Sequence, residues 1–327
     1  MKKITAILSA LFMFVTLAGS QAAASTISIG YIIAGPDDYY NVSAEVVKFG
    51  GSQRGWDVTI LNSEYTPEKE ISNVEDLIAK NVDGIMVLAA NMESAQTATQ
   101  KANAAGIPIV FIAGGPAEGS GVPNTIVAGN WAFSGEWHGN NLNNVKPDAK
   151  VALAAAVAGQ DIGTLITDAF KANFKGNIVS EQFCNWSRSE TLAYVQDLIA
   201  SNTDFDTVFA YNEEQAAGAR QALQENGYSP GEVWIISNNG KDIGIEMLEQ
   251  GWMQYTIQFA PTTEAYVGVL AMEAILDGKE VKPMIENPAI TISKDNLDAA
   301  ITWDPVQFAN DDHKKIDLEQ VMATILK

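Results

Sequence analysis

Three aromatic side chains stand directly after predicted strands, where they fall outside the regular apolar pattern of a core. Tyr39 and Tyr40 follow the strand expected over residues 27–33, and Trp186 follows the strand expected over 177–183. Flat aromatic rings can cover the C–H face of a small ligand, so this placement predicts a stacking platform. The alternative is that the rings pack in the wall between two domains, and the residue types alone leave both interpretations open.

Polar residues at one helix start suit either ligand binding or a structural role. Asn212 opens the helix expected over 212–226 and is followed by Glu213 and Glu214. Asn is a good N-cap, and acidic residues in the first turn complement the helix dipole. Asn212 therefore stays a candidate for binding or for capping, whereas capping is favoured for the two glutamates.

The neighbouring pair Asp37-Asp38 poses the same question before the helix expected over 40–54. Two carboxylates can act as general acid and base, yet no second carboxylate or histidine is predicted to face them. We interpret the pair as caps of that helix.

Signatures of cofactor, metal or nucleophile chemistry are missing from the sequence. The Gly-rich stretch 114–121 lacks the Gly-Lys-Ser/Thr of a phosphate loop, and neither a dinucleotide fingerprint nor a G-x-S-x-G elbow occurs. There is a single cysteine, Cys184, and the two histidines, His138 and His313, lie far apart. Asp311-Asp312-His313 fits a solvated turn better than a metal cluster. We therefore expect no catalytic residue, no cofactor and no metal.

The charge balance disfavours nucleic acids and anionic membranes as partners. The 327 residues include 20 Lys or Arg and 40 Asp or Glu, which gives a formal net charge of −20. Phosphate contacts and a polybasic hold on a membrane both need clustered basic residues. A chain of this length, with 47% hydrophobic residues, is expected to form two globular domains.

The N-terminus has the three parts of an export signal. Lys2 and Lys3 precede an uncharged, mostly apolar run over residues 4–18, and Ala22-Ala23-Ala24 resembles a cleavage site. This run is shorter than the ~20 residues that cross a bilayer, which disfavours a membrane anchor. We expect residues 1–24 to be a signal peptide that is cleaved near Ala24, and the mature protein to be exported to the periplasm.

From residue 26 onward the chain alternates short apolar runs with longer amphipathic stretches, in two series. Strands are expected over 27–33, 57–62, 84–89 and 108–112, and then over 151–156, 177–183, 208–210 and 233–237. Buried strands separated by helices predict parallel sheets covered on both faces. The expected fold class is therefore α/β, with two doubly wound parallel-sheet lobes. Ligands of such sheets bind at the carboxyl ends of the strands, where the aromatic and amide residues lie.

Three local motifs follow one another in a characteristic order and spacing. They are Pro67-Glu68-Lys69-Glu70 continuing to Val74 and Asp76-Leu77, then Ala105-Gly106-Ile107-Pro108-Ile109-Val110, and then Val208-Phe209-Ala210-Tyr211-Asn212 with Gly218-Ala219. In these motifs the chain resembles the periplasmic binding proteins of pentose and hexose ABC transporters, those of the ribose-binding type. That family shares its fold with the ligand domains of LacI-type repressors. The resemblance extends over nearly all of the expected mature chain.

The resemblance implies roles for five residues. It places Tyr39 and Tyr40 on two ligand-contacting aromatic positions and Trp186 on the stacking aromatic position of the second lobe. Asn212 falls on the family's ligand-binding Asn, and Asn239 stands where the family has an Asp.

Departures from the family pattern are as informative as the matches. Ala113-Gly114 stand in place of an Asp-Arg pair, Thr164 in place of an Arg, and Phe259 in place of a Gln. Charge-assisted hydrogen bonds contribute about 1.5–3 kcal/mol each to the binding free energy, so neutral replacements should weaken the binding of ribose. We predict poor binding of D-ribose. Replacement contacts are expected from Trp131, Asp161 and Arg188. Ala113, Gly114, Thr164 and Phe259 stay in the candidate ligand-binding set, because they occupy the family's binding positions.

The resemblance also implies two lobes joined by three crossings, near Gly129, Ala260 and Ala289. The expected N-terminal lobe then comprises residues 25–128 and 261–289, and the C-terminal lobe comprises 129–260 and 290–327.

The expected function is that of a periplasmic solute-binding protein. It would close its lobes on a small sugar or polyol and deliver it to the membrane subunits of an ABC transporter, without a nucleotide site of its own. One alternative is a sensing subunit for a chemoreceptor or sensor kinase. Another is an exported sugar-acting enzyme, which the missing nucleophile–base pair disfavours. A LacI-type repressor is excluded, because an export signal stands where a helix-turn-helix would be.

Overall fold

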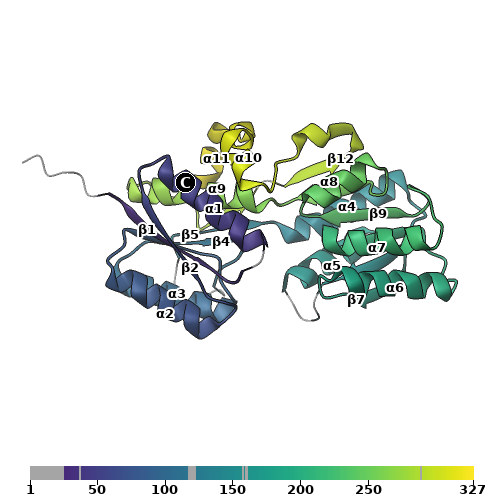
Figure 1. Cartoon of the computed structure of the whole chain (residues 1–327), viewed down its shortest axis with the longest axis horizontal. Coiled ribbons are helices and arrows are strands. Elements are labelled where there is room, and N and C mark those ends of the chain that lie inside the picture. Colours follow the sequence, from purple (N-terminus) through teal and green to yellow (C-terminus); the bar gives the residue numbers. More distant parts are fainter. Residues whose placement is uncertain (1–25, 37, 117–122, 157, 159–160, 288) are drawn as a thin grey trace, which may run out of the picture.

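The computed structural model describes residues 26–36, 38–116, 123–156, 158, 161–287 and 289–327. The expected signal peptide lies outside these residues, as do Asp37 and most of the Gly-rich stretch after Pro116. Figure 1 shows two lobes side by side, each with a central sheet and helices on both faces. The predicted α/β class with two doubly wound lobes is confirmed.

The N-terminal lobe is built on a six-stranded sheet in which all paired strands are parallel. Its strand order is β11 (Met284–Asn287), β5 (Thr125–Gly129), β4 (Ile109–Ile112), β3 (Gly84–Val87), β1 (Ser28–Ile33) and β2 (Asp57–Asn62). Alternate residues of β1 face opposite ways. Tyr31 and Ile33 pack with α1 (Asp38–Ser52) and α9 (Pro261–Leu276), whereas Ile32 packs with α2 (Pro67–Ala79) and α3 (Met92–Ala105). Burial on both faces explains why the strand is apolar throughout.

The C-terminal lobe repeats this plan with one difference at its edge. Its sheet has the order β12 (Ile290–Ser293), β10 (Tyr255–Gln258), β9 (Trp234–Asn238), β8 (Thr207–Ala210), β6 (Lys150–Ala155) and β7 (Asn177–Phe183). The edge strand β12 runs antiparallel to β10. Leu153 packs toward α4 (Trp131–Val145) and α5 (Asp161–Asn173). Ala152 packs toward the opposite layer, formed by α6 (Arg188–Ala200), α7 (Glu213–Glu225) and α8 (Asp242–Glu249).

The chain passes between the two sheets at three short links. They join β5 to α4, β10 to α9, and β11 to β12. Because each link is only a few residues long, the carboxyl ends of the neighbouring strands are brought to the same junction between the lobes.

The C-terminal residues lie against the N-terminal lobe, which corrects one expectation. Residues 290–327 were assigned to the C-terminal lobe, and β12 with the 3-10 helix η1 (Lys294–Ala299) follows that sheet. The chain then returns to α1 and α9 as α10 (Pro305–Asn310), η2 (Asp312–Lys315) and α11 (Leu318–Ile325), as Figure 1 shows. Phe308, Val321 and Ile325 are buried there in the core of the N-terminal lobe. The assignment was wrong because short amphipathic helices do not reveal which lobe their apolar faces will cover.

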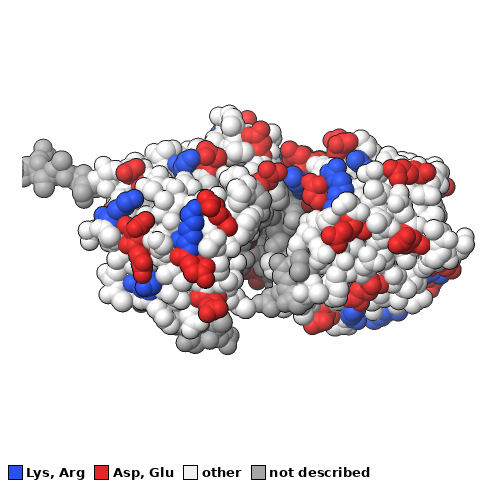
Figure 2. Space-filling model, turned by 60° about the horizontal axis from the view of Figure 1, so that its bottom comes forward, with Lys and Arg blue, Asp and Glu red and all other residues white. Residues whose placement is uncertain are grey.

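The acidic character is spread over the surface. On the face shown in Figure 2, acidic side chains are scattered over both lobes with basic ones between them, and a hollow separates the lobes. In the described part of the chain, no helix combines the length and apolarity needed to cross a membrane.

Candidate functional site

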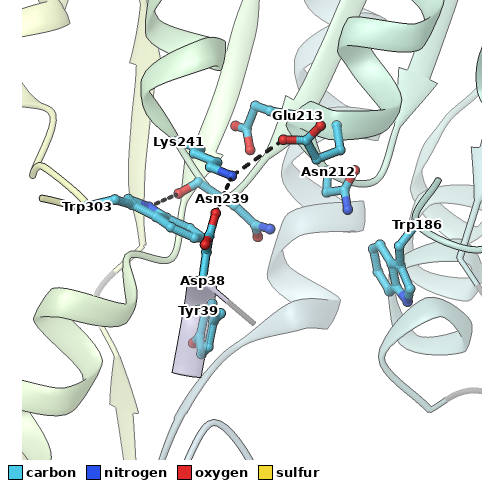
Figure 3. Close-up of a pocket in the computed structure, with 9 residues that line it drawn as sticks. Asp38, Tyr39, Trp186, Asn212, Glu213, Asn239, Lys241 and Trp303 are labelled. Atoms are coloured by element: carbon cyan, nitrogen blue, oxygen red, sulfur yellow. Dashed lines mark hydrogen bonds and ion pairs between the residues drawn. The ribbon is translucent and has the colours of Figure 1, made fainter. Parts of the chain in front are cut away.

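A cavity of about 530 Å³ lies between the lobes, at the carboxyl ends of β7, β8 and β9. Its walls, drawn in Figure 3, combine aromatic, amide and charged side chains. The lining residues are Asp38, Tyr39, Trp186, Asn212, Glu213, Glu214, Asn239, Lys241 and Trp303. The structure thus brings together four residues that the sequence singled out, Tyr39, Trp186, Asn212 and Asn239. Their part in binding stays a prediction.

Tyr39 is held in the first turn of α1 by contacts to three sides. Its hydroxyl donates a hydrogen bond to Glu264 of α9. Its ring lies edge-on to the rings of Tyr40 and Trp303, with centroids 6.0 and 5.7 Å apart. Burial raises the pKa of Glu264 to about 7 and raises the pKa of Tyr39 well above its usual value. The tyrosine therefore stays a neutral donor, and its ring is presented to the cavity.

Trp186 lies in a strained turn after β7. Asn185 and Trp186 both adopt left-handed backbone angles, with φ of 49° and 58°. Asn tolerates this region, whereas a bulky residue there costs on the order of 1–3 kcal/mol. The turn is held by the Ser187 amide, which donates to Cys184 O at 2.7 Å, and by Asn185 Nδ2, which donates to Glu190 at 2.8 Å. These bonds fix the strained conformation that places the indole at the cavity.

Asn212 both caps a helix and faces the cavity. Its Oδ1 accepts a hydrogen bond from Gln215 N at 2.8 Å, which satisfies one free amide at the start of α7. The cap occupies Oδ1, so Nδ2 is the group that can donate to a ligand. The two alternatives that the sequence left open are therefore compatible in one side chain.

Asn239 adopts a left-handed backbone, with φ of 93°, in the turn after β9. Its amide donates to Ile257 O at 2.8 Å, which ties the turn to β10. Its Oδ1 is buried and has no hydrogen-bond partner among the described residues. A buried acceptor without a partner is costly, so a ligand hydroxyl that donates to it would be favoured.

The buried Glu213 side chain holds the turn after β9 that carries Asn239. Its Oε1 accepts hydrogen bonds from Gly240 N at 2.7 Å and from Thr256 Oγ1 at 2.6 Å. Burial raises the pKa of Glu213 to about 8, so the carboxyl group is largely protonated near neutral pH. Gly240 has φ of 64°, and a Cβ there would lie 2.7 Å from Gln258 atoms, so only glycine fits.

A chain of ion pairs runs along one wall of the cavity. Arg188 Nη2 lies 2.8 Å from Glu214 Oε2, and Lys241 Nζ lies 3.4 Å from Glu214 Oε1. Lys241 Nζ is also 3.4 Å from Asp38 Oδ2, a contact that Figure 3 shows with a dashed line. Two cations thus face two carboxylates, and the last pair joins the C-terminal lobe to the N-terminal lobe.

Two predicted site residues pack on each other instead of lining the cavity. The rings of Trp131 and Phe259 have centroids 4.5 Å apart, and Phe259 is fully buried. They lie at the links that follow β5 and β10. Tyr40 likewise packs between Tyr39 and Tyr65.

The other predicted residues are not among the lining residues, although Arg188 pairs with Glu214, which is one of them. Ala113 adopts φ of 63° and donates its amide to Val127 O, and a Cβ on Gly114 would meet open space. Thr164 and Arg188 are exposed. Asp161 is the first residue of α5, and its side chain lies outside the part of the chain that the structure describes.

Five lining residues were not predicted to bind. The sequence favours helix capping for Asp38, Glu213 and Glu214, although all three also reach the cavity. Lys241 follows Asn239-Gly240 directly, so extending the strand-end turn by one residue would have found it. Trp303 had no local signal, because it comes from the C-terminal segment.

The lining residues that the structure describes include no histidine or cysteine. His138 is buried in α4, where desolvation lowers its pKa to about 4, and burial raises the pKa of the Cys184 thiol to about 11. Among the described residues, no group of three or more His, Cys, Asp or Glu side chains is placed to hold a metal ion.

Comparison with known proteins identifies the family. Residues 29–280 match the periplasmic binding protein domain. The ribose import binding protein of Haemophilus influenzae is 27% identical over 289 residues, which covers 87% of this chain and 97% of that protein. The corresponding protein of Escherichia coli is 25% identical over 291 residues and covers 86% and 95%.

Solved structures share the fold. An ABC transporter periplasmic solute binding protein from Actinobacillus succinogenes with bound D-allose has a TM-score of 0.75 at 22% identity, covering 84% of this chain and 100% of that one. A solute binding protein from Bacillus halodurans with bound myo-inositol has a TM-score of 0.74 at 19% identity, covering 84% and 96%. The family match spans most of the chain, and these relatives are binding proteins rather than enzymes. The chain therefore belongs to the periplasmic binding protein family.

Proposed function

We infer that this protein captures a neutral, polyhydroxylated small molecule between its lobes and delivers it to an ABC transporter. The observation that carries this proposal is the interlobe cavity, whose walls combine aromatic faces with amide groups. Aromatic rings stack on the C–H faces of sugars, and amides pair with hydroxyl groups. Relatives named for ribose import, and neighbours with bound D-allose or myo-inositol, support sugars and polyols as the ligand class.

The electrostatics of the cavity favour a ligand without charge. Lys241 is compensated by Asp38 and Glu214, and Glu214 is also paired with Arg188. Glu213 is largely protonated near neutral pH because burial raises its pKa to about 8. A sugar acid or an amino sugar would have to compete with these existing pairs, whereas a neutral ligand leaves them intact.

Ribose itself is expected to bind poorly. Ala113 and Gly114 offer no polar side chain, and Phe259 is buried against Trp131. The charged and polar side chains with which ribose-binding relatives are expected to bind ribose at these positions are therefore missing from this chain.

Export and delivery complete the proposal. The tripartite N-terminus supports cleavage near Ala24 and a periplasmic mature protein, in keeping with the family. The import function of the relatives supports ABC transporter membrane subunits as partners. Presentation of the loaded form to a chemoreceptor is the second partner role to test, by comparing uptake and signalling in a deletion strain.

The test is a thermal-shift screen of residues 25–327 followed by calorimetric titration. The panel contains D-allose, myo-inositol, xylitol and D-ribose, with glucuronate and glucosamine as charged probes. At least one neutral compound should bind, with stabilisation of about 2.7 kcal/mol at a hundredfold excess over Kd. Trp186→Leu should abolish the shift, whereas Phe183→Leu, on β7 outside the lining, should leave it unchanged.

Binding of charged probes alone, or of no compound, would overturn the proposed ligand class. Micromolar or tighter binding of D-ribose would contradict the expectation drawn from Ala113, Gly114 and Phe259.

A further inference from the structure

We propose that Trp303, supplied by the C-terminal segment 301–327, contacts the ligand and favours cyclic sugars and cyclitols over acyclic polyols. This inference rests on the proposed function and names the ligand class more closely. It gives a recognition role to a segment that lies beyond the family domain match, which ends at residue 280.

The backbone before Trp303 is fixed by a buried glutamine of β10. Ile301 N donates to Gln258 Oε1 at 2.7 Å, and Gln258 Nε2 donates to Ile301 O at 2.8 Å. Gln258 is 1% exposed, so these bonds are shielded from water. The same Nε2 donates to Gly240 O at 2.9 Å, which connects this point to the turn of Asn239.

The next residue is held from the other lobe. Thr302 N donates to the buried Asp312 at 2.9 Å, and Thr302 O accepts from Thr262 Oγ1, on α9, at 2.8 Å. Both residues before Trp303 are thus held by two hydrogen bonds each. These bonds fix the backbone that carries the Trp303 side chain.

The indole of Trp303 is placed at the cavity by three contacts. It lies edge-on to the Tyr39 ring, its Nε1 donates to Asn239 O at 3.3 Å, and Lys241 Nζ lies 5.9 Å from its centroid. In the view of Figure 3, Trp303 and Trp186 stand on opposite sides of the pocket.

These contacts define what the indole can offer. Its N–H is used by a backbone carbonyl and Trp303 is 8% exposed, so the small part of the indole that reaches the cavity is apolar and offers the ligand no donor. Two indoles on opposite sides suit a molecule with C–H groups on the faces of a ring. An acyclic polyol presents no such face and must also lose chain flexibility on binding.

Three variants test the proposal by titration with D-allose, myo-inositol and xylitol. Trp303→Leu keeps an apolar side chain and removes the flat ring, and Trp303→Phe keeps a smaller ring. Val306→Ala, on the same segment, is the control, because Val306 is 67% exposed and lies outside the lining.

The wild type should prefer a cyclic compound to xylitol. Trp303→Leu should weaken binding of that compound about threefold to tenfold and reduce the preference, with a smaller loss in Trp303→Phe. Val306→Ala should bind as the wild type does. If circular dichroism shows that Trp303→Leu does not fold, the test rests on Trp303→Phe. A reduced affinity of that variant for the cyclic compound supports the proposal, and wild-type affinity contradicts it.

Wild-type affinity and preference in the folded Trp303 variants would overturn the inference. A wild-type preference for xylitol would overturn it as well. If Asn212→Asp loses binding while Trp303→Leu retains it, the proposed function stands without this inference. If no neutral compound binds the wild type, the proposed function fails and the inference fails with it.

Discussion

At the scale of single residues, the cavity uses side chains that also maintain local structure. Asn212 caps α7 through Oδ1, and the Asn239 turn is tied to β10 and to the Trp303 indole. Because the cap uses Oδ1 and the proposed ligand contact uses Nδ2 of the same Asn, sequence patterns could not separate the two roles. The two Asn residues at strand ends nevertheless indicated where the cavity would lie, since Asn212 and Asn239 both line it.

Substitution of Asn212 should separate its two roles. Asn212→Asp keeps an oxygen acceptor for Gln215 N and removes the Nδ2 donor, so stability should stay near that of the wild type while affinity falls tenfold or more. Asn212→Ala should lose the same affinity and also about 1 kcal/mol of stability. Urea unfolding and titration calorimetry measure the two effects. Wild-type affinity in Asn212→Asp would show that Nδ2 does not contact the ligand.

At the scale of elements, the turn between β9 and α8 depends on a buried acid of α7. Glu213 accepts from Gly240 N and from Thr256, and burial raises its pKa from 4.5 to about 8. Between these two values the folded protein keeps a proton that the unfolded chain releases. This contribution to stability is therefore fully present below pH 4.5 and is lost as the pH rises through 8.

Glu213→Gln should reduce the dependence of the free energy of unfolding on pH between pH 4.5 and 8. One proton corresponds to a slope of at most about 1.4 kcal/mol per pH unit. Glu70 and Glu264 also have raised pKa values because of burial, and the lowered pKa of His138 acts in the opposite direction below pH 6.5. The comparison of variant with wild type removes these shared contributions. Urea unfolding at pH 5, 6.5 and 8 should show a smaller loss of stability in the variant, and parallel profiles would contradict the assignment.

At the scale of the whole molecule, the cavity is completed by groups from both lobes and from the C-terminal segment. Asp38 from α1 pairs with Lys241 from the C-terminal lobe, so this contact exists only when the lobes are close. The pair is partly exposed and is worth ~0.2–1 kcal/mol, enough to bias closure slightly.

Removal of the pair should change affinity and its dependence on salt. Asp38→Asn should weaken ligand binding by up to about fivefold, because the ion pair that favours closure is lost. Binding of a neutral ligand to the wild type should weaken modestly as salt rises, and this dependence should shrink in the variant. Asp76→Asn, on the exposed face of α2, is the matched control. Equal salt dependence in all three proteins would argue against an interlobe role for Asp38.

The sequence by itself determined the α/β class, the two series of strands and helices, and the strand ends where Tyr39, Trp186, Asn212 and Asn239 lie. These features follow from local periodicity and from the rule that parallel sheets bind ligands at their carboxyl ends. Tertiary structure alone decided that Trp131 and Phe259 pack together, that Lys241 meets Asp38, and that Trp303 returns to the cavity. The physical reason is that these contacts join residues far apart in the chain. Their partners are set by how the lobes and the C-terminal helices cover one another's apolar faces.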